Sequence, residues 1–238
     1  MKKNFTNKYF NATIRIKEFF MKKTVITCML LQKMHSALYS ALQPEIHVNS
    51  NYAEAIYFPI NALMANQLQK NDELTVIILK FNDDINPTSE NNFQANYQIF
   101  QNEMNKINET IGAKIEYKII ETDFVETNDV FAERFLNIFN ILEQDCTIYT
   151  DITFGPKTAT LLIMNLLSFA ENFYDADIEA IIYGKTSFIA TGEQTETTAK
   201  GGKVLDVSSL YFLNNFTDAI HAQSPQDAIQ VLKELFLQ

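Results

Sequence analysis

The stretch "CTIYTDITFGPKTATLLIMNLLSF", residues 146–169, holds the most informative pattern in the chain. It begins with a short β-rich run, Cys146–Thr150, and leads into a long apolar run of helical character, Ala159–Phe173. Between them lies DITFGPKT, Asp151–Thr158, in a chain of 238 residues with only 6 glycines and 5 prolines. A strand, a Gly-Pro-Lys-Thr turn and a helix therefore follow one another, as in the units of an α/β fold.

The turn itself predicts an anion site. Proline suits the first position of a helix, which makes Pro156 the expected first residue and Gly155 the expected N-cap. The backbone N–H groups of Lys157, Thr158 and Ala159 would then have no acceptor within the helix. They would point out of its positive end, beside a lysine and a threonine hydroxyl. The alternative is a capped helix start with an exposed lysine.

Two common nucleotide motifs do not match. An ATP-binding P-loop requires G-x-x-x-x-G-K-[ST], but here Pro156 precedes Lys157 and Asp151 stands at the first glycine position. Proline has no N–H to offer to a phosphate. The segment after the first expected strand, Met29–Ser36, contains no glycine, which disfavours NAD or FAD bound in the usual manner. No cofactor is expected.

The composition narrows the class of protein. Hydrophobic residues make up 47% and charged residues 20%, as in a globular domain. The net charge of −10 argues against a protein that coats long DNA or RNA, although a few local cations can still hold a small phosphorylated ligand. No apolar run is long enough to cross a membrane.

The cysteines and histidines carry no metal motif. Cys28 and Cys146 fall in expected strands and are interpreted as buried thiols of a reducing compartment, which predicts a cytoplasmic protein. His35, His47 and His221 lack metal-ligand spacing, so no metal site is expected.

Strand-like and helix-like segments alternate along the chain. The expected strands are 24–28, 74–79, 115–120, 146–150, 178–183 and 204–207, and the expected helices are 52–69 (with Pro59 near its start or kinking it), 93–111, 128–142, 157–173, 210–221 and a last one capped by Ser224. Near-continuous apolar strands predict a Rossmann-like parallel sheet with helices on both faces, forming a single domain over residues 21–238. Residues 1–20 are expected to be an extension outside this core, or alternatively an extra helix.

Ligands of such sheets bind beyond the carboxyl ends of the strands. Three segments follow strands there and are expected to converge on one site: Met29–Ser36, Asp151–Thr158 and Tyr183–Thr186. The polar stretch Thr191–Lys203, with its three glycines, is a candidate lid or a solvated connection.

The stretch "DITFGPKTATLLIMNLLSFAENFYDADIEAIIYGK" resembles the CARF family, the CRISPR-associated Rossmann-fold sensor domains. One branch has a D-x-T-H-G signature after a strand, then an apolar helix, a strand and a Tyr-Gly pair. The matching residues are Asp151, Thr153, Gly155, Tyr183 and Gly184, with Phe154 in place of the histidine and Lys157 similar to the lysine of a T-G-G-x-K form. A second departure is the absence of the glycine-bearing loop that usually follows the first strand.

The resemblance implies a homodimer that binds a cyclic oligoadenylate, with cyclic tetra-adenylate as the favoured ring, in type III CRISPR antiviral defence. It implies ligand contacts from the turn, and the loop after the first strand is the candidate for the opposite wall. From the resemblance and from this placement, the expected ligand-binding residues are Asp151, Thr153, Phe154, Gly155, Lys157, Thr158, Gln32, Lys33, Tyr183 and Gly184.

Individual roles follow from side-chain chemistry. Lys157 would pair with a phosphate, and the hydroxyls of Thr153 and Thr158 would bond phosphate or ribose. Asp151 should avoid phosphate; its partner is a ribose hydroxyl or the backbone of its own turn. The apolar helix after Lys157 is buried on several sides, in the core or at a dimer seam.

Three functions stay open. The first is a sensor that relays ligand binding to a partner or to an effector domain outside this chain, because no room for a nuclease, deaminase or NAD-cleaving domain is expected. The second is a ring nuclease that cleaves the ligand by attack of a 2′-hydroxyl, with Lys157, Ser36 and His35 as candidate catalytic residues. The third is an unrelated flavodoxin-like domain for another phosphorylated metabolite.

Overall fold

The structure is a computed structural model that describes residues 21–43, 46–48, 56–82, 87–123, 125–189, 198–219 and 224–236. Residues 1–20, expected as an extension, lie outside the described residues. The strands are β1 (Lys22–Cys28), β2 (Tyr39–Ala41), β3 (Glu73–Asn82), β4 (Lys114–Asp123), β5 (Thr147–Asp151), β6 (Asp177–Ile189) and β7 (Thr198–Asp206). The helices are α1 (Pro59–Gln67), α2 (Ser89–Asn108), α3 (Asn128–Phe139), α4 (Lys157–Phe173), α5 (Ser208–Ala219) and α6 (Pro225–Phe236).

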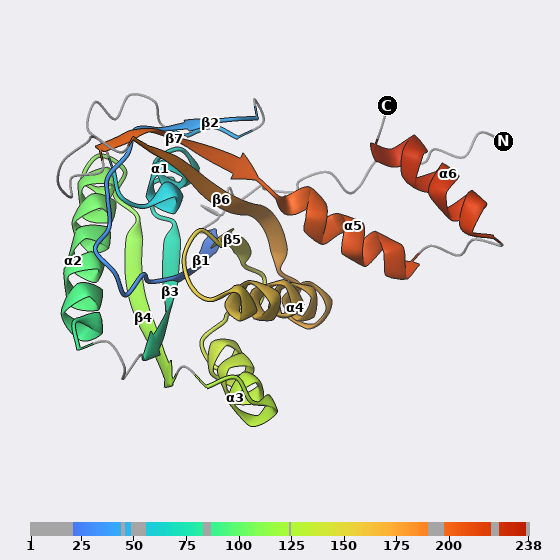
Figure 1. Cartoon of the computed structure of the whole chain (residues 1–238), viewed down its shortest axis with the longest axis horizontal. Coiled ribbons are helices and arrows are strands. Elements are labelled where there is room, and N and C mark those ends of the chain that lie inside the picture. Colours follow the sequence, from blue (N-terminus) through green and yellow to red (C-terminus); the bar gives the residue numbers. More distant parts are fainter. Residues whose placement is uncertain are drawn as a thin grey trace, which may run out of the picture.

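The strands form one sheet of seven in the order β2-β7-β6-β5-β1-β3-β4, drawn in Figure 1. All neighbouring strands are parallel except β6 and β7. From the central β1 the chain builds outward through β3 and β4 on one side, and later through β5 and β6 on the other. The strand order therefore reverses between β1 and β5, where α/β sheets hold their ligands. The predicted α/β, Rossmann-like, single-domain fold is confirmed.

Alternate residues of the central strands supply two separate cores. Val25 and Val76 are fully buried in a cluster with residues of α1 and α2, on one face of the sheet. Their neighbours Ile26 and Ile77 are equally buried in a second cluster with residues of α3 and α4. Successive side chains of a strand point to opposite faces, so a sheet covered on both sides needs a continuous apolar run. This requirement explains the run LTVIIL in β3.

The first predicted helix is shorter than expected. The helix expected from residue 52 begins only at Pro59, because Phe58 is extended (φ −112°, ψ 116°) and Ile56 forms a β-bridge with Ala37. Pro59 therefore stands at the start of the helix, which was one of the two positions expected for it, and does not kink the helix. Residues 49–55 lie outside the described part of the chain.

The lid prediction for Thr191–Lys203 is wrong over residues 198–203, which belong to β7. Gly202 packs so closely on Tyr39 of β2 that a Cβ atom would lie 2.4 Å from the tyrosine ring. The three-residue strand β2 was not predicted, because a segment this short carries no periodicity. Residues 191–197 are not described.

The last two helices project from one side of the sheet, and α6 stands apart from it in Figure 1. The predicted cap of α6 is confirmed: the amide of Asp227 donates to Ser224 Oγ at 3.1 Å. Among the described residues, no helix is both long and apolar enough to cross a bilayer.

Candidate ligand-binding site

The turn after β5 is held together by Asp151. This residue is completely buried, and its Oδ1 accepts from the amide of Thr153 at 2.8 Å and from the Thr153 hydroxyl. Thr153 Oγ1 in turn accepts from the amide of Gly184 in β6 at 2.7 Å. Of the two expected partners of Asp151, the structure shows the backbone of its own turn. The hydroxyl of Thr153 is likewise used to fasten the turn to β6.

Gly155 and Phe154 fit the same turn to the core. Gly155 has a φ of +96°, and a Cβ atom at this position would lie 2.7 Å from Cys28 Cβ. Only glycine satisfies both conditions. Phe154, which replaces the signature histidine, packs edge-on against Phe58 with ring centroids 5.8 Å apart.

The predicted start of α4 is off by one residue. Pro156, not Gly155, is the N-cap, with an extended backbone (φ −69°, ψ 155°), and the helix begins at Lys157. The carbonyl of Pro156 accepts from the amide of Ala159 at 3.0 Å, so this amide is not available to a ligand. Gly155 must supply the positive φ that closes the turn, and this moves the cap to the next residue. The amides of Lys157 and Thr158 keep the first-turn positions that lack intrahelical acceptors.

Charges around this helix start are mixed. The Lys157 side chain is exposed, whereas the Thr158 hydroxyl donates to the carboxylate of Glu126. An acidic group is favourable at a helix N-terminus, and Glu126 therefore occupies a place that a phosphate would seek. Sequence reasoning missed Glu126 because it precedes Thr158 by 32 residues.

The loop after β1 is held by side chains of α2, which lie more than sixty residues further along the chain. Asn96 of α2, only 2% exposed, donates its side-chain amide to the carbonyls of Leu30 at 2.7 Å and Gln32 at 2.8 Å. Asn92, one turn earlier, donates to the carbonyl of Leu31 at 3.1 Å. Three successive carbonyls that the sheet does not pair are thus satisfied by side chains.

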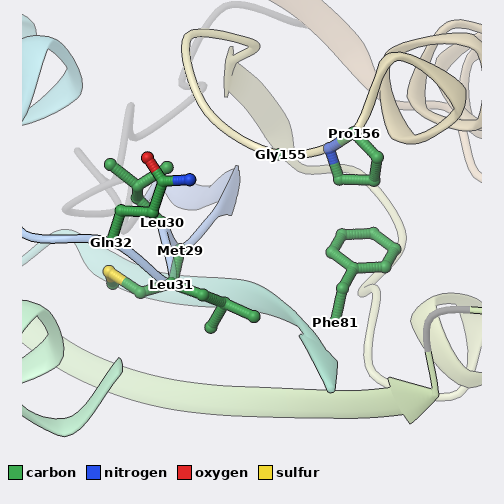
Figure 2. A pocket seen from close by; sticks show the side chains of 7 residues that line it. All are labelled: Met29, Leu30, Leu31, Gln32, Phe81, Gly155 and Pro156. Atoms are coloured by element: carbon green, nitrogen blue, oxygen red, sulfur yellow. The ribbon is translucent and has the colours of Figure 1, made fainter. Parts of the chain in front are cut away.

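The loop and the turn enclose a pocket of about 250 Å³ at the point where the strand order reverses, shown in Figure 2. Among the described residues its walls are apolar apart from one side-chain amide; the lining residues are Met29, Leu30, Leu31, Gln32, Phe81, Gly155 and Pro156. Two of the three segments expected to converge, those after β1 and β5, therefore meet here. The third reaches the turn through the Gly184–Thr153 hydrogen bond.

The predicted site residues divide into three groups. Gln32 and Gly155 line the pocket, and Lys157 directly follows the lining residue Pro156. Asp151, Thr153, Phe154 and Gly184 hold the turn from within. Outside the pocket lining lie Thr158, Lys33, Tyr183, His35 and Ser36; of these Lys33, Tyr183 and His35 are exposed.

Burial shifts two ionisable groups next to the pocket. Removal from water raises the pKa of Asp151 to about 6, although its hydrogen bonds from Thr153 act in the opposite direction. Burial and the nearby Asp151 raise the pKa of the Cys28 thiol to about 12. Cys28 and Cys146 are 1% and 2% exposed, which confirms buried thiols. At neutral pH Cys28 is a protonated packing residue and not a nucleophile.

A comparison with protein-family models finds no match for this sequence, and a comparison with curated proteins finds no significant relative. The function must therefore be argued from the pocket itself.

Proposed function

We propose that the protein is a binding module for a cyclic oligoadenylate, with cyclic tetra-adenylate as the favoured ring, and that it acts as a homodimeric sensor in type III CRISPR defence. The observation that carries the proposal is the pocket at the reversal of strand order, enclosed by the loop after β1 and the D-x-T-x-G turn. The resemblance of that turn to the CARF signature supplies the identity of the ligand.

The pocket suits one base and one phosphate of such a ring. Apolar walls from Met29, Leu31 and Phe81 favour the faces of an adenine, and the Gln32 amide offers a donor and an acceptor to its edge. A phosphate attached to this nucleoside would reach the first amides of α4 and the Lys157 ammonium. Binding would require the Glu126 carboxylate to leave Thr158.

Exposed apolar side chains support the homodimer. Along α4, Leu161 and Phe173 are each 65% exposed, and the neighbouring α3 exposes Leu136 at 62%. We take these three exposed apolar side chains on adjacent helices as the candidate dimer interface. A ring with two-fold symmetry would bind across an isologous dimer, in which each protomer presents the same pocket.

The lining favours a sensor over a ring nuclease. None of the described residues that line the pocket has an ionisable side chain. Cleavage by a ribose 2′-hydroxyl needs that hydroxyl to be placed in line and the transition-state charge to be stabilised. The candidates Lys157, Ser36 and His35 lie outside the lining, which disfavours cleavage. Slow cleavage is the second outcome that the binding test can detect.

The test is incubation with cyclic tri-, tetra- and hexa-adenylate, followed by calorimetry and by chromatography of bound and cleaved species. We expect one ring per dimer and a dimer mass without ligand at tens of micromolar by light scattering. Absence of binding to all three rings at micromolar concentrations would contradict the proposal. Binding of a different phosphorylated metabolite instead would favour the flavodoxin-like alternative.

The matched variants are Lys157→Ala and, as a control for an exposed lysine elsewhere, Lys70→Ala. A charge-assisted contact to phosphate contributes roughly 1.5–3 kcal/mol. A two-fold site loses two such contacts, so affinity should fall by roughly two orders of magnitude or more. Equal affinity of Lys157→Ala and Lys70→Ala would remove Lys157 from the site.

A further inference from the structure

A second hollow lies at the β2 edge of the sheet, over β2, β7 and β6. It has a volume of about 480 Å³ and is lined by Leu38, Ser40, Leu42, Lys185, Gly201, Gly202, Lys203 and Leu205. The lining side chains alternate along each strand with buried ones such as Tyr39 and Val204. The hollow is therefore the outer face of the sheet at its β2 edge, separate from the pocket between β1 and β5.

Two lysines are paired directly across this face. Lys185 of β6 is the register partner of Lys203 of β7 in the antiparallel ladder, and both side chains are exposed. Like charges directly opposite each other destabilise a sheet. Lys203 Nζ donates to Ser40 Oγ at 2.8 Å, and within the described part of the chain neither ammonium forms an ion pair with a carboxylate.

This arrangement is unusual for this chain, which has 29 acidic and 19 basic residues. Other lysines of the same sheet, such as Lys80, Lys114 and Lys118, are each paired with a carboxylate. Beside the two ammonium groups, Leu38 and Leu42 are 55% and 57% exposed. The hollow thus combines two adjacent positive charges with an apolar rim.

We propose that this hollow is a second binding site, for a small dianionic phosphate ester with an apolar body. A phosphate monoester carries up to two negative charges at neutral pH, which match the two ammonium groups. The leucines would cover the apolar body, and the volume lies in the range of small-molecule sites. A concave hollow of this size favours a single small ligand over a membrane surface.

The test uses phenyl phosphate as the probe and isothermal calorimetry at low salt as the readout. The double variant Lys185→Gln/Lys203→Gln should lose at least tenfold in affinity, and Leu42→Ser should weaken binding of phenyl phosphate but not of inorganic phosphate. Lys70→Gln is the matched control, because this exposed lysine lies in the lining of neither pocket and its removal should leave the probe's affinity unchanged. The double variant leaves the first pocket intact, so its affinity for cyclic tetra-adenylate separates failure of the second site from failure of the oligoadenylate proposal.

Thermal unfolding with and without the probe adds a second readout, and only its probe-dependent part distinguishes a binding site from a lysine pair that merely repels. If the pair repels in the free protein, Lys185→Gln should raise the Tm of the free protein by roughly 1–3 °C. With saturating phenyl phosphate the wild type should gain more Tm than the variant. Equal probe affinity in wild type and double variant would overturn the proposal. The proposal would also be overturned if phenyl phosphate failed to bind while the wild type co-sedimented with anionic phospholipid vesicles and the double variant did not.

Discussion

The two walls of the first pocket are built in opposite ways. The turn after β5 is fixed by its own residues, through the hydrogen bonds from Thr153 to Asp151 and the positive φ of Gly155. The loop after β1 is fixed by Asn92 and Asn96, which lie more than sixty residues further along the chain. The first wall is a local structure and the second a tertiary one, so they should respond differently to mutation, to pH and to partial unfolding.

The largest expected effect comes from Gly155→Ala. The positive φ costs an L-residue about 1–2 kcal/mol, and the contact with Cys28 adds overpacking of about 1–3 kcal/mol. The free energy of unfolding, measured in urea, should therefore fall by roughly 2–5 kcal/mol. Gly112→Ala is the control, because its φ is +81° but the nearest atom to a new Cβ is 3.9 Å away. If both variants lose the same amount, the contact with Cys28 does not constrain the turn.

The second-largest expected effect is a pH dependence of the free energy of unfolding, which arises from Asp151 in the turn. The folded-state pKa of Asp151 is raised from 3.8 to about 6, so the folded protein holds this proton more tightly than the unfolded chain. Its contribution to the free energy of unfolding, roughly 2–3 kcal/mol, is complete below about pH 4 and is lost as the pH rises through 6. Burial also raises the pKa of Glu103 to about 7. This carboxyl likewise stabilises the protein at low pH, and its contribution to the free energy of unfolding is lost as the pH rises through 7.

Urea unfolding of the wild type, Asp151→Asn and Glu103→Gln between pH 4 and 8 separates the two carboxyls. Asp151→Asn keeps an oxygen that can accept from Thr153, and it should flatten the stability curve between pH 4 and 6. Glu103→Gln should flatten mainly the upper part of the range. A wild-type slope that persists unchanged in Asp151→Asn would show that the buried carboxyl does not titrate there.

The third effect tests the tertiary wall. Asn96→Ala removes two hydrogen bonds to the loop after β1 and should lower the free energy of unfolding by about 1–3 kcal/mol. Hydrogen exchange followed by mass spectrometry should speed up across Met29–Ser36 and stay unchanged across Asp151–Gly155. Asn92→Ala, which removes one bond to the loop from a half-buried position, is the milder comparison. Faster exchange in both walls would mean that they open as one unit.

The smallest effect concerns Lys157. Its side chain is exposed at the positive end of α4, where a cation is slightly unfavourable. Lys157→Ala should therefore shift the free energy of unfolding by no more than about 0.5 kcal/mol. Thermal unfolding without ligand checks this. A large loss would assign Lys157 a structural role and would weaken any conclusion drawn from its effect on binding.

The same contrast explains what could be predicted from the sequence. The local wall was largely predictable: the turn and the bounds of α4 follow from short patterns, and only the cap was displaced by one residue. The hydrogen bond from Gly184 to Thr153 was not predicted, because it joins the turn to a residue of β6. The parallel sheet followed from apolar strands alternating with helices. The contacts of Asn96 and of Glu126 could not be predicted, because they join residues that only the folded chain brings together.

The central position of β1 has a consequence for biosynthesis. Lys23 pairs with Leu74 in β3 and with Thr147 in β5, and the second partner is made only after more than half of the chain has followed. During translation β1 therefore has an unsatisfied edge for a long interval, and parallel pairing at this sequence separation is slow. We expect the nascent protein to need protection by a chaperone until the segment that carries the pocket's turn has left the ribosome.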